Sequence, residues 1–162
     1  MQRLGPNGEE APAVDLEPVA DADRDELFFM FADYWEELDA ADPLAPLPYG
    51  VAEYRRALLE DLEDRQLVWI RAGGTRAGFA FIRLATDWPD TALIAEISEF
   101  YVVPASRRIG VGQAAVREIS RSCRASGAIR LEVDVLTGNP GALAFWRACG
   151  LADLRRSLFV TL

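Results

Sequence analysis

Histidine and lysine are both absent from this 162-residue sequence. Their absence excludes histidine-based catalytic triads, metal sites built on histidine, and lysine Schiff bases. A general base must therefore be a carboxylate, a tyrosine, a cysteine or water, and we expect no metal site. The two cysteines, Cys123 and Cys149, form neither a disulfide framework nor a metal-ligand pattern. We expect both to be reduced and to pack as small apolar side chains.

Long apolar runs are also lacking. None approaches the ~20 residues that a membrane-spanning helix needs, and the first ten residues lack the apolar core of a signal peptide. We therefore expect a cytoplasmic protein that does not contact a membrane. Residues 1–12 have almost no apolar content and predict a mobile tail, whereas residues 13–162 suit a single domain.

Positive charge is scarce, because the formal net charge is −9 and every one of the 17 basic residues is an arginine. This acidity disfavours nucleic-acid binding and favours cationic partners such as amines, which the field of the protein would attract. Exclusive use of arginine is also what a genome-wide composition bias produces. In that case the acidic surface reflects solubility alone, and both interpretations stay open.

The stretch from Glu99 to Gly112 carries the strongest local pattern. It predicts a strand over 100–103 that Pro104 ends, a basic turn, and a helix from Val111 to Ala125. A helix that begins after such a turn presents unpaired backbone N–H groups, which favours a phosphate site. The turn lacks the glycine and lysine patterns of dinucleotide-binding sites and P-loops, and alone it fits an ordinary loop-to-helix turn equally well.

A second segment strengthens the phosphate interpretation. A short strand predicted over 131–136 leads into Asn139-Pro-Gly-Ala-Leu-Ala-Phe-Trp-Arg-Ala-Cys-Gly150-Leu. Together the two segments resemble the GNAT superfamily of acyl-coenzyme-A-dependent N-acyltransferases. The pyrophosphate pattern of that family is matched by Arg107, Gly110 and Gly112, and its second motif by Asn139, Ala142 and Phe145.

The resemblance implies acetyl-CoA as co-substrate and an amine as acceptor, with direct attack in a ternary complex. The residues implied around the pyrophosphate are Arg107, Arg108, Ile109, Gly110, Val111, Gly112 and Gln113. Those implied beside the pantetheine arm are Asn139, Ala142, Phe145 and Trp146. At the last position most of the family has a tyrosine thought to protonate the departing thiolate. The indole of Trp146 cannot act as an acid near neutral pH, so this role is not carried over.

The strand before Pro104 supplies the remaining candidates. In the family, backbone donors at the positions of Tyr101, Val102 and Val103 polarise the thioester carbonyl. Glu99 matches the position of a glutamate base found in many members, and Glu96 is a second carboxylate on the same strand. Regular alternation places the two on opposite faces, so both reach one cleft only if a bulge intervenes. An exposed or salt-bridged structural role for Glu99 is equally open.

Hydrophobic spacing predicts the remaining elements. We expect strands over 14–19, 66–72, 77–86, 92–103 and 131–136, and one bent or two short strands over 151–162. A helix opens with a capping box of Asp23 and Glu26, and a second helix follows a loop over 39–50. The order βααββ-βαβαβ predicts an α/β fold of the α+β type, with a mixed sheet and helices on both faces. This agrees with the GNAT fold.

The first two predicted helices and their connection are rich in carboxylates, in the region that usually lines the acceptor groove in GNAT proteins. They are Glu36, Glu37, Asp39, Asp42, Glu53, Glu60, Asp61, Glu63 and Asp64. This collective charge favours an N-acetyltransferase that acts on a small cationic amine or a protein amine. The alternative is a coenzyme-A-binding sensor or interaction module with little transferase activity, which Trp146 favours. A turn that binds nothing is a third interpretation. Exposed sheet edges favour a homodimer.

Overall fold

The computed structural model describes residues 12–41, 50–60, 65–87, 91–158 and 160, so the tail predicted over 1–12 lies almost wholly outside the described residues. The strands are β1 (Val14–Pro18), β2 (Arg65–Ala72), β3 (Thr75–Asp87), β4 (Ala92–Val102) and β5 (Arg130–Glu132). The α-helices are α1 (Arg24–Ala41), α2 (Val51–Glu60), α3 (Val111–Ala125) and α4 (Pro140–Ala148). Two short 3-10 turns, η1 (Asp21–Asp23) and η2 (Pro104–Ser106), precede α1 and follow β4.

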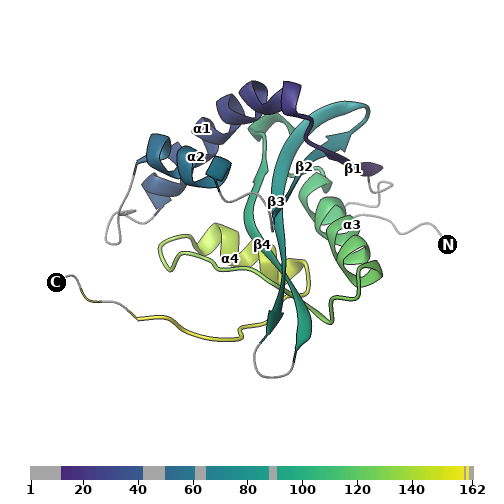
Figure 1. Cartoon of the computed structure of the whole chain (residues 1–162), viewed down its shortest axis with the longest axis vertical. Helices are drawn as coiled ribbons and strands as arrows, with labels where there is room; N and C mark the ends of the chain where they lie inside the picture. Colours follow the sequence, from purple (N-terminus) through teal and green to yellow (C-terminus); the bar gives the residue numbers. More distant parts are fainter. Residues whose placement is uncertain (1–11, 42–49, 61–64, 88–90, 159, 161–162) are drawn as a thin grey trace.

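The five strands form one mixed sheet in the order β1-β2-β3-β4-β5 (Figure 1). Neighbours from β1 to β4 are antiparallel, and β5 pairs with β4 in parallel. The parallel pair follows from the α3 crossover between β4 and β5, as the sequence predicts. The mixed α/β fold with helices on both faces is therefore confirmed.

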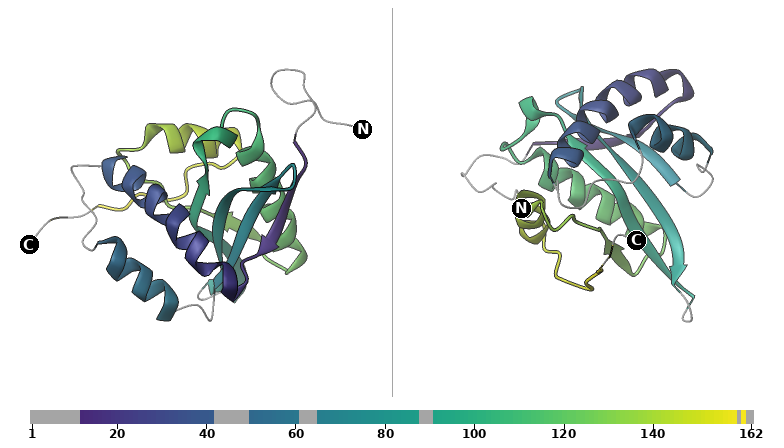
Figure 2. Two further views of the ribbon diagram at one scale, coloured as in Figure 1. Left: turned by 90° about the horizontal axis from the view of Figure 1, so that it is seen from above. Right: turned by 90° about the vertical axis from the view of Figure 1, so that its left-hand side faces the viewer.

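Helices cover both faces of the sheet, and each face has its own core (Figure 2). On one side, Leu27, Phe31 and Trp35 of α1 pack on aromatic residues of the sheet, namely Trp69, Phe79, Phe81 and Tyr101. On the other side, α3 and Trp146 of α4 pack on smaller aliphatic residues such as Ile70, Ala80 and Ile82. The predicted helical spacing of Leu27, Phe31 and Trp35 is what directs one stripe of α1 onto the sheet.

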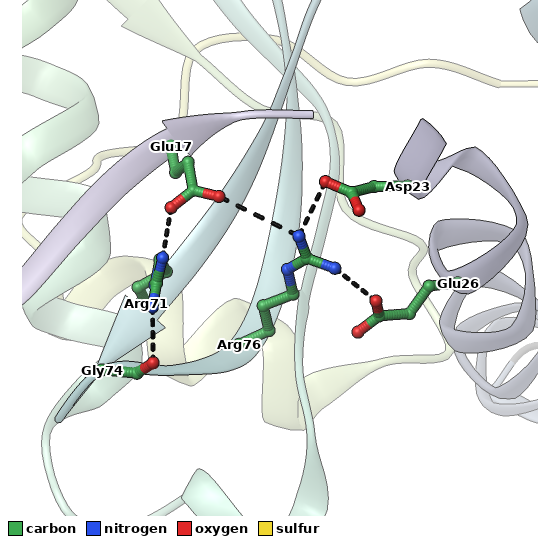
Figure 3. Close-up of polar contacts among 6 residues, drawn as sticks. All are labelled: Glu17, Asp23, Glu26, Arg71, Gly74 and Arg76. Atoms are coloured by element: carbon green, nitrogen blue, oxygen red, sulfur yellow. Dashed lines mark hydrogen bonds and ion pairs between the residues drawn. The ribbon is translucent and has the colours of Figure 1, made fainter. Parts of the chain in front are cut away.

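The β2–β3 hairpin turns through Gly73 and Gly74, whose φ angles of 57° and 81° only glycine adopts without cost. Beside this turn, Arg76 binds carboxylates from three other elements, β1, η1 and α1 (Figure 3). Its Nη2 lies 2.7 Å from Asp23 Oδ2 and 4.0 Å from Glu17 Oε1, and its Nη1 contacts Glu26. The carboxylates expected to form a capping box therefore tie the start of α1 to the hairpin.

Two strand predictions at the C-terminal side were wrong in extent. The strand expected over 131–136 is limited to Arg130–Glu132, and residues 151–158 and 160 contain no strand. In the latter segment, Leu154, Leu158 and Val160 are exposed, with 58%, 89% and 77% of their surfaces accessible, so their side chains do not pack on the sheet. Side-chain ion pairs hold the segment instead, including Arg155 Nη2 to Glu132 Oε2 at 2.7 Å. Helix α1 also continues to Ala41, into the region expected to be a loop.

Candidate active site

A β-bulge in β4 decides which way its carboxylates point. Phe81 of β3 pairs with Glu99, but the next residue, Ile82, pairs with Ile97, so Ser98 is the extra residue. The bulge reverses the alternation of side chains along the strand. Glu96 and Glu99 consequently lie on the same face, the one that α1 and α2 cover. This is the bulge that the sequence required if both carboxylates were to share one cleft.

Glu99 is buried, with 7% of its surface exposed, and it is the buried charged residue of the described chain. Tyr34 of α1 donates its hydroxyl to Glu99 Oε2 at 2.5 Å, and Tyr54 of α2 donates to Oε1. Burial raises the pKa of Glu99, while the two tyrosine hydrogen bonds and the positive charge of Arg65 act in the opposite direction. The exposed or salt-bridged alternative for Glu99 does not describe this environment.

The two tyrosines respond to the same carboxylate. Burial raises the pKa of both Tyr34 and Tyr54, and the charge and hydrogen bond of Glu99 raise them further. Both hydroxyls therefore stay protonated near neutral pH and act as donors to Glu99. Glu96 is much more exposed, with 39% of its side chain accessible, and lies 3.9 Å from Arg83.

An open hollow of about 420 Å³ lies beside the end of β4. Three carboxylates of α1 line it together with three other residues: Asp33, Glu36, Glu37, Ala40, Tyr101 and Pro104. Tyr101 donates its hydroxyl to Glu37 Oε1 at 3.4 Å. Of the carboxylates predicted from sequence to make this region acidic, Glu36 and Glu37 line the hollow, whereas Asp42, Asp61, Glu63 and Asp64 lie outside the described residues.

The sheet opens next to this hollow, because β5 pairs with β4 only at Ile94, Ala95 and Glu96. The backbone N–H of Val103 is not free to polarise a carbonyl, since it donates to Ala77 C=O at 2.9 Å. Successive N–H groups of a strand point to opposite sides, so the N–H of Val102 points toward the open side of β4. Of the three donors implied by the resemblance, Val102 is thus the one that the hydrogen bonding leaves oriented for this task.

The turn that connects β4 to α3, residues 103–110, is named the anion turn below, after the phosphate site predicted there from the sequence. Arg108 and Gly110 adopt left-handed backbone conformations, with φ of 65° and 88°, and Gly110 is the N-cap of α3. The first hydrogen bond into the helix runs from Ala114 N–H to Gly110 C=O. Helix geometry therefore leaves the N–H groups of Val111, Gly112 and Gln113 without partners inside the helix. Ile109 in the same turn is 64% exposed.

Arg107, expected at the pyrophosphate, makes its contacts within the protein. Its Nε donates to Val102 C=O at 2.6 Å, and its Nη2 lies 2.9 Å from both carboxylate oxygens of Glu37. Its guanidinium carbon lies 5.2 Å from the centre of the Tyr101 ring. Arg107 thus connects the anion turn to the acidic hollow, while Arg108 is the exposed arginine at the rim.

The second motif lies against the first. A Cβ added at Gly112 would be 3.0 Å from Phe145 Cε2, so the absence of a side chain lets α4 approach the start of α3. Asn139 caps α4, accepting a hydrogen bond at its Oδ1 from the N–H of Ala142 at 2.9 Å. Trp146 is buried and packs edge-to-face on Phe100 and Phe145, with ring centres 5.2 and 5.0 Å apart. Its indole belongs to the core.

Sequence reasoning missed Tyr34, Tyr54, Arg65 and Asp33 as members of the site. One signal could have found Tyr34, because its hydroxyl sits on the apolar stripe of a helix. A hydroxyl in that position needs a buried acceptor, and Glu99 is the acceptor it finds.

Other features bear on what the site can hold. No group of three or more acidic, cysteine or histidine side chains among the described residues is arranged to bind a metal ion. Cys123 is buried and Cys149 half-buried, and burial raises the pKa of both thiols, that of Cys149 to about 11.

Within the described parts of the chain, every helix is too short or too polar to cross a membrane.

Comparison with known proteins gives the family and the fold. No curated protein matches the sequence. A putative acetyl transferase from Pyrococcus furiosus is similar in structure, with a TM-score of 0.71 and 18% identity over 93% of this chain and 100% of that one. The aminoglycoside 6'-N-acetyltransferase AAC(6')-IG from Acinetobacter haemolyticus has a TM-score of 0.69 and 12% identity over 91% and 97%. The aminoglycoside acetyltransferase meta-AAC0020, from an uncultured soil metagenomic sample and in complex with sisomicin, has a TM-score of 0.66 and 16% identity over 92% and 96%. The sequence itself matches the profile described as the Acetyltransferase (GNAT) family over residues 26–151, so this chain belongs to the GNAT family and is an acyltransferase.

Proposed function

We propose that this protein is an N-acetyltransferase that moves an acetyl group from acetyl-CoA to a primary amine, by direct attack in a ternary complex. The observation that carries the proposal is the content of β4. This strand holds the buried Glu99 and, two residues later, Tyr101 in the lining of the acidic hollow, and it leads into the anion turn before α3.

The anion turn fits the pyrophosphate of coenzyme A. Left-handed conformations at Arg108 and Gly110 and the free N–H groups at the start of a 15-residue helix form a cradle for a phosphate-sized anion. Acetyl-CoA supplies the activated acetyl group when it is bound. Val102, whose N–H faces the open side of β4, would donate a hydrogen bond to the carbonyl oxygen that gains negative charge. Asn139, Ala142 and Phe145 would then line the same cleft from α4.

The acidic hollow fits a cationic acceptor. Asp33, Glu36 and Glu37 attract an ammonium group, and the overall charge of −9 assists its approach. Two similar structures carry the names of aminoglycoside acetyltransferases, and aminoglycosides are polycationic amines. Both points support a primary amine on a small cationic molecule as the acceptor.

Glu99 would accept the proton that the amine loses. Without histidine or lysine the base must be a carboxylate, a tyrosine, a cysteine or water, and Glu99 is the buried carboxylate on this face. Trp146 cannot protonate the departing thiolate from its place in the core. The thiol of the coenzyme has an ordinary pKa near ~8.5, so the thiolate needs modest help from water or from the Tyr101 hydroxyl.

Titration calorimetry with acetyl-CoA and with coenzyme A tests the donor site, and thiol release in the presence of an amine panel tests the transfer. Charge reversal Arg108→Glu at the rim should weaken coenzyme A binding about tenfold, since it changes the charge near the phosphates by two units. Arg124→Glu, at the opposite end of α3, is the matched control and should leave the Kd unchanged. Equal effects of the two variants would contradict the donor site. Binding without thiol release from any amine would favour the coenzyme-A-binding module instead.

A further inference from the structure

The proposed function does not say how a proton from the acceptor amine reaches Glu99. Both of its carboxylate oxygens accept tyrosine hydroxyls, and the residue has only 7% of its surface exposed. A proton leaving an amine in the hollow must therefore pass a shell of protein to reach it. The lining of the hollow does not include Glu99 itself.

The two tyrosines are not equivalent in position. Tyr34 follows Asp33 directly and precedes Glu37 by one turn of α1, and both of those residues line the hollow. Its ring also packs against Tyr101, another lining residue, with ring centres 5.8 Å apart. Both tyrosines also touch the aromatic core: Tyr34 lies 5.6 Å from Phe31 and 5.7 Å from Phe79, and Tyr54 lies 5.6 Å from Phe31 and 5.0 Å from Trp35. Tyr34 thus contacts both Glu99 and Tyr101, a residue that lines the hollow.

We propose that Tyr34 passes the proton of the acceptor amine to Glu99, and that Tyr54 is a positioning residue that holds the same carboxylate in place. The proposal rests on the proposed acetyl transfer. As the amine nitrogen bonds to the acetyl carbon, its N–H bond breaks and the proton moves to Tyr34 Oη. The original O–H proton of Tyr34 moves to Glu99 Oε2, and the electrons of the C–S bond leave with the thiolate. Tyr34 ends neutral and Glu99 ends as a carboxylic acid.

Four groups from four elements face Glu99 and set its ionisation. They are Tyr34 of α1, Tyr54 of α2, Arg65 of β2 and Glu96 of β4. The hydroxyl hydrogen bonds stabilise the charged carboxylate against the effect of burial, so removing either of them raises the pKa of Glu99. Transfer requires ionised Glu99, and the acidic limb of the pH–rate profile then moves to higher pH.

Tyr34→Phe and Tyr54→Phe form a matched pair, because each removes one hydroxyl from the same carboxylate. Both variants should shift the acidic limb of kcat upward in pH. The plateau above that limb distinguishes them: we expect Tyr34→Phe to lower it by about tenfold or more and Tyr54→Phe by less than about threefold. Calorimetric Kd values for coenzyme A should match the wild type in both. Equal plateaus for the two variants, whether lowered or unchanged, would overturn the relay.

A wild-type measurement covers the case in which Tyr34→Phe does not fold. Single-turnover rates in mixtures of H2O and D2O should curve with the deuterium fraction, because two protons move together. A linear dependence, or none, would overturn the relay. Neither the plateau of kcat nor the deuterium dependence of the single-turnover rate depends on the affinity for coenzyme A. The absence of thiol release from wild-type protein with every amine would instead be a failure of the proposed function.

Discussion

The two faces of the sheet are built from different kinds of residue. The face under α1 and α2 is aromatic and holds the buried Glu99 with its two tyrosine partners. The face under α3 and α4 is mainly aliphatic, with Ala115 and Ile119 fully enclosed. The same strands serve both faces, since successive side chains of a strand point in opposite directions.

The α1 and α2 face holds the candidate catalytic residue, and the α3 and α4 face has a structural role. A buried carboxylate is costly, and the α1 and α2 face tolerates it because rigid phenols supply the hydrogen bonds that water would otherwise make. Among the residues that the structure describes, the α3 and α4 face carries no buried charged group. Its task is to hold the anion turn and the start of α3 against α4, with Phe145 touching the position of Gly112. Substitutions on the two faces should therefore separate activity from stability.

The largest effect is expected at Gly78 of β3, a strand that contributes side chains to the cores on both faces of the sheet. A Cβ at this position would lie 2.0 Å from the carbonyl oxygen of Tyr101, and a backbone atom cannot yield. Gly78→Val should therefore separate β3 from β4 and abolish cooperative unfolding measured by circular dichroism. Gly141→Ala in α4 is the control, because its Cβ would meet Asn139 Oδ1 at an ordinary 3.7 Å. It should cost nothing or gain up to about 1 kcal/mol. Similar melting curves for the two variants would contradict this packing.

Two conservative core substitutions, one on each face of the sheet, should have similar effects on stability but different effects on kcat. Phe31→Leu removes a ring that stacks on Tyr54 and Phe81 at 5.6 and 5.8 Å, while Ile119→Val trims a methylene from the other core. We expect each to lower the free energy of unfolding by about 1–2 kcal/mol. Only Phe31→Leu should also lower kcat, by about threefold or more, because Tyr34, whose ring packs edge-to-face on Phe31 at 5.6 Å, loses its support. Denaturant unfolding and steady-state rates provide both readouts. Equal loss of kcat in the two variants would show that activity follows stability alone.

A smaller effect should follow from the charge of the hollow. Asp33→Asn and Glu36→Gln each remove one carboxylate from its lining, and each should raise KM for a cationic amine by up to about fivefold. The effect should shrink as salt is added. Glu118→Gln, on α3, makes the same change in net charge and should leave KM unaltered. A uniform rise in KM for all three would mean that overall charge, and not the hollow, attracts the acceptor.

The smallest effect concerns stability and pH. Burial raises the pKa of Glu99 above its ordinary value of 4.5, so the folded protein binds this proton more tightly than the unfolded chain does. The contribution of Glu99 to stability is therefore fully present below pH 4.5 and is lost as pH rises through the folded-state pKa. Relative to Glu99→Gln, the wild type should lose free energy of unfolding as pH rises from 4.5 through the folded-state pKa. A difference that is constant over this range, or that grows, would contradict the burial argument.

Much of the fold follows from sequence periodicity, but less of the site does. The spacing of Leu27, Phe31 and Trp35 gives α1, and the Gly73-Gly74 pair gives the hairpin, because both signals are local. The anion turn is local too, and its glycines are visible in the sequence. The partners of Glu99 are separated from it by 65 and 45 residues, so a local pattern can mark the Tyr34 hydroxyl as one that needs a buried acceptor but cannot identify Glu99 as that acceptor. Arg107 illustrates the same limit, since its contact with Glu37 spans 70 residues.

The measurement that tests the account most directly is the turnover of Glu99→Gln with a cationic amine, compared with its affinity for coenzyme A. The variant keeps the size of the side chain and removes its ability to accept the amine proton. We expect kcat to fall by tenfold or more, because general-base contributions run to ~10²–10⁴-fold, while the calorimetric Kd for coenzyme A stays unchanged. An unchanged kcat would remove Glu99 from the chemistry and make its tyrosine shell a structural feature.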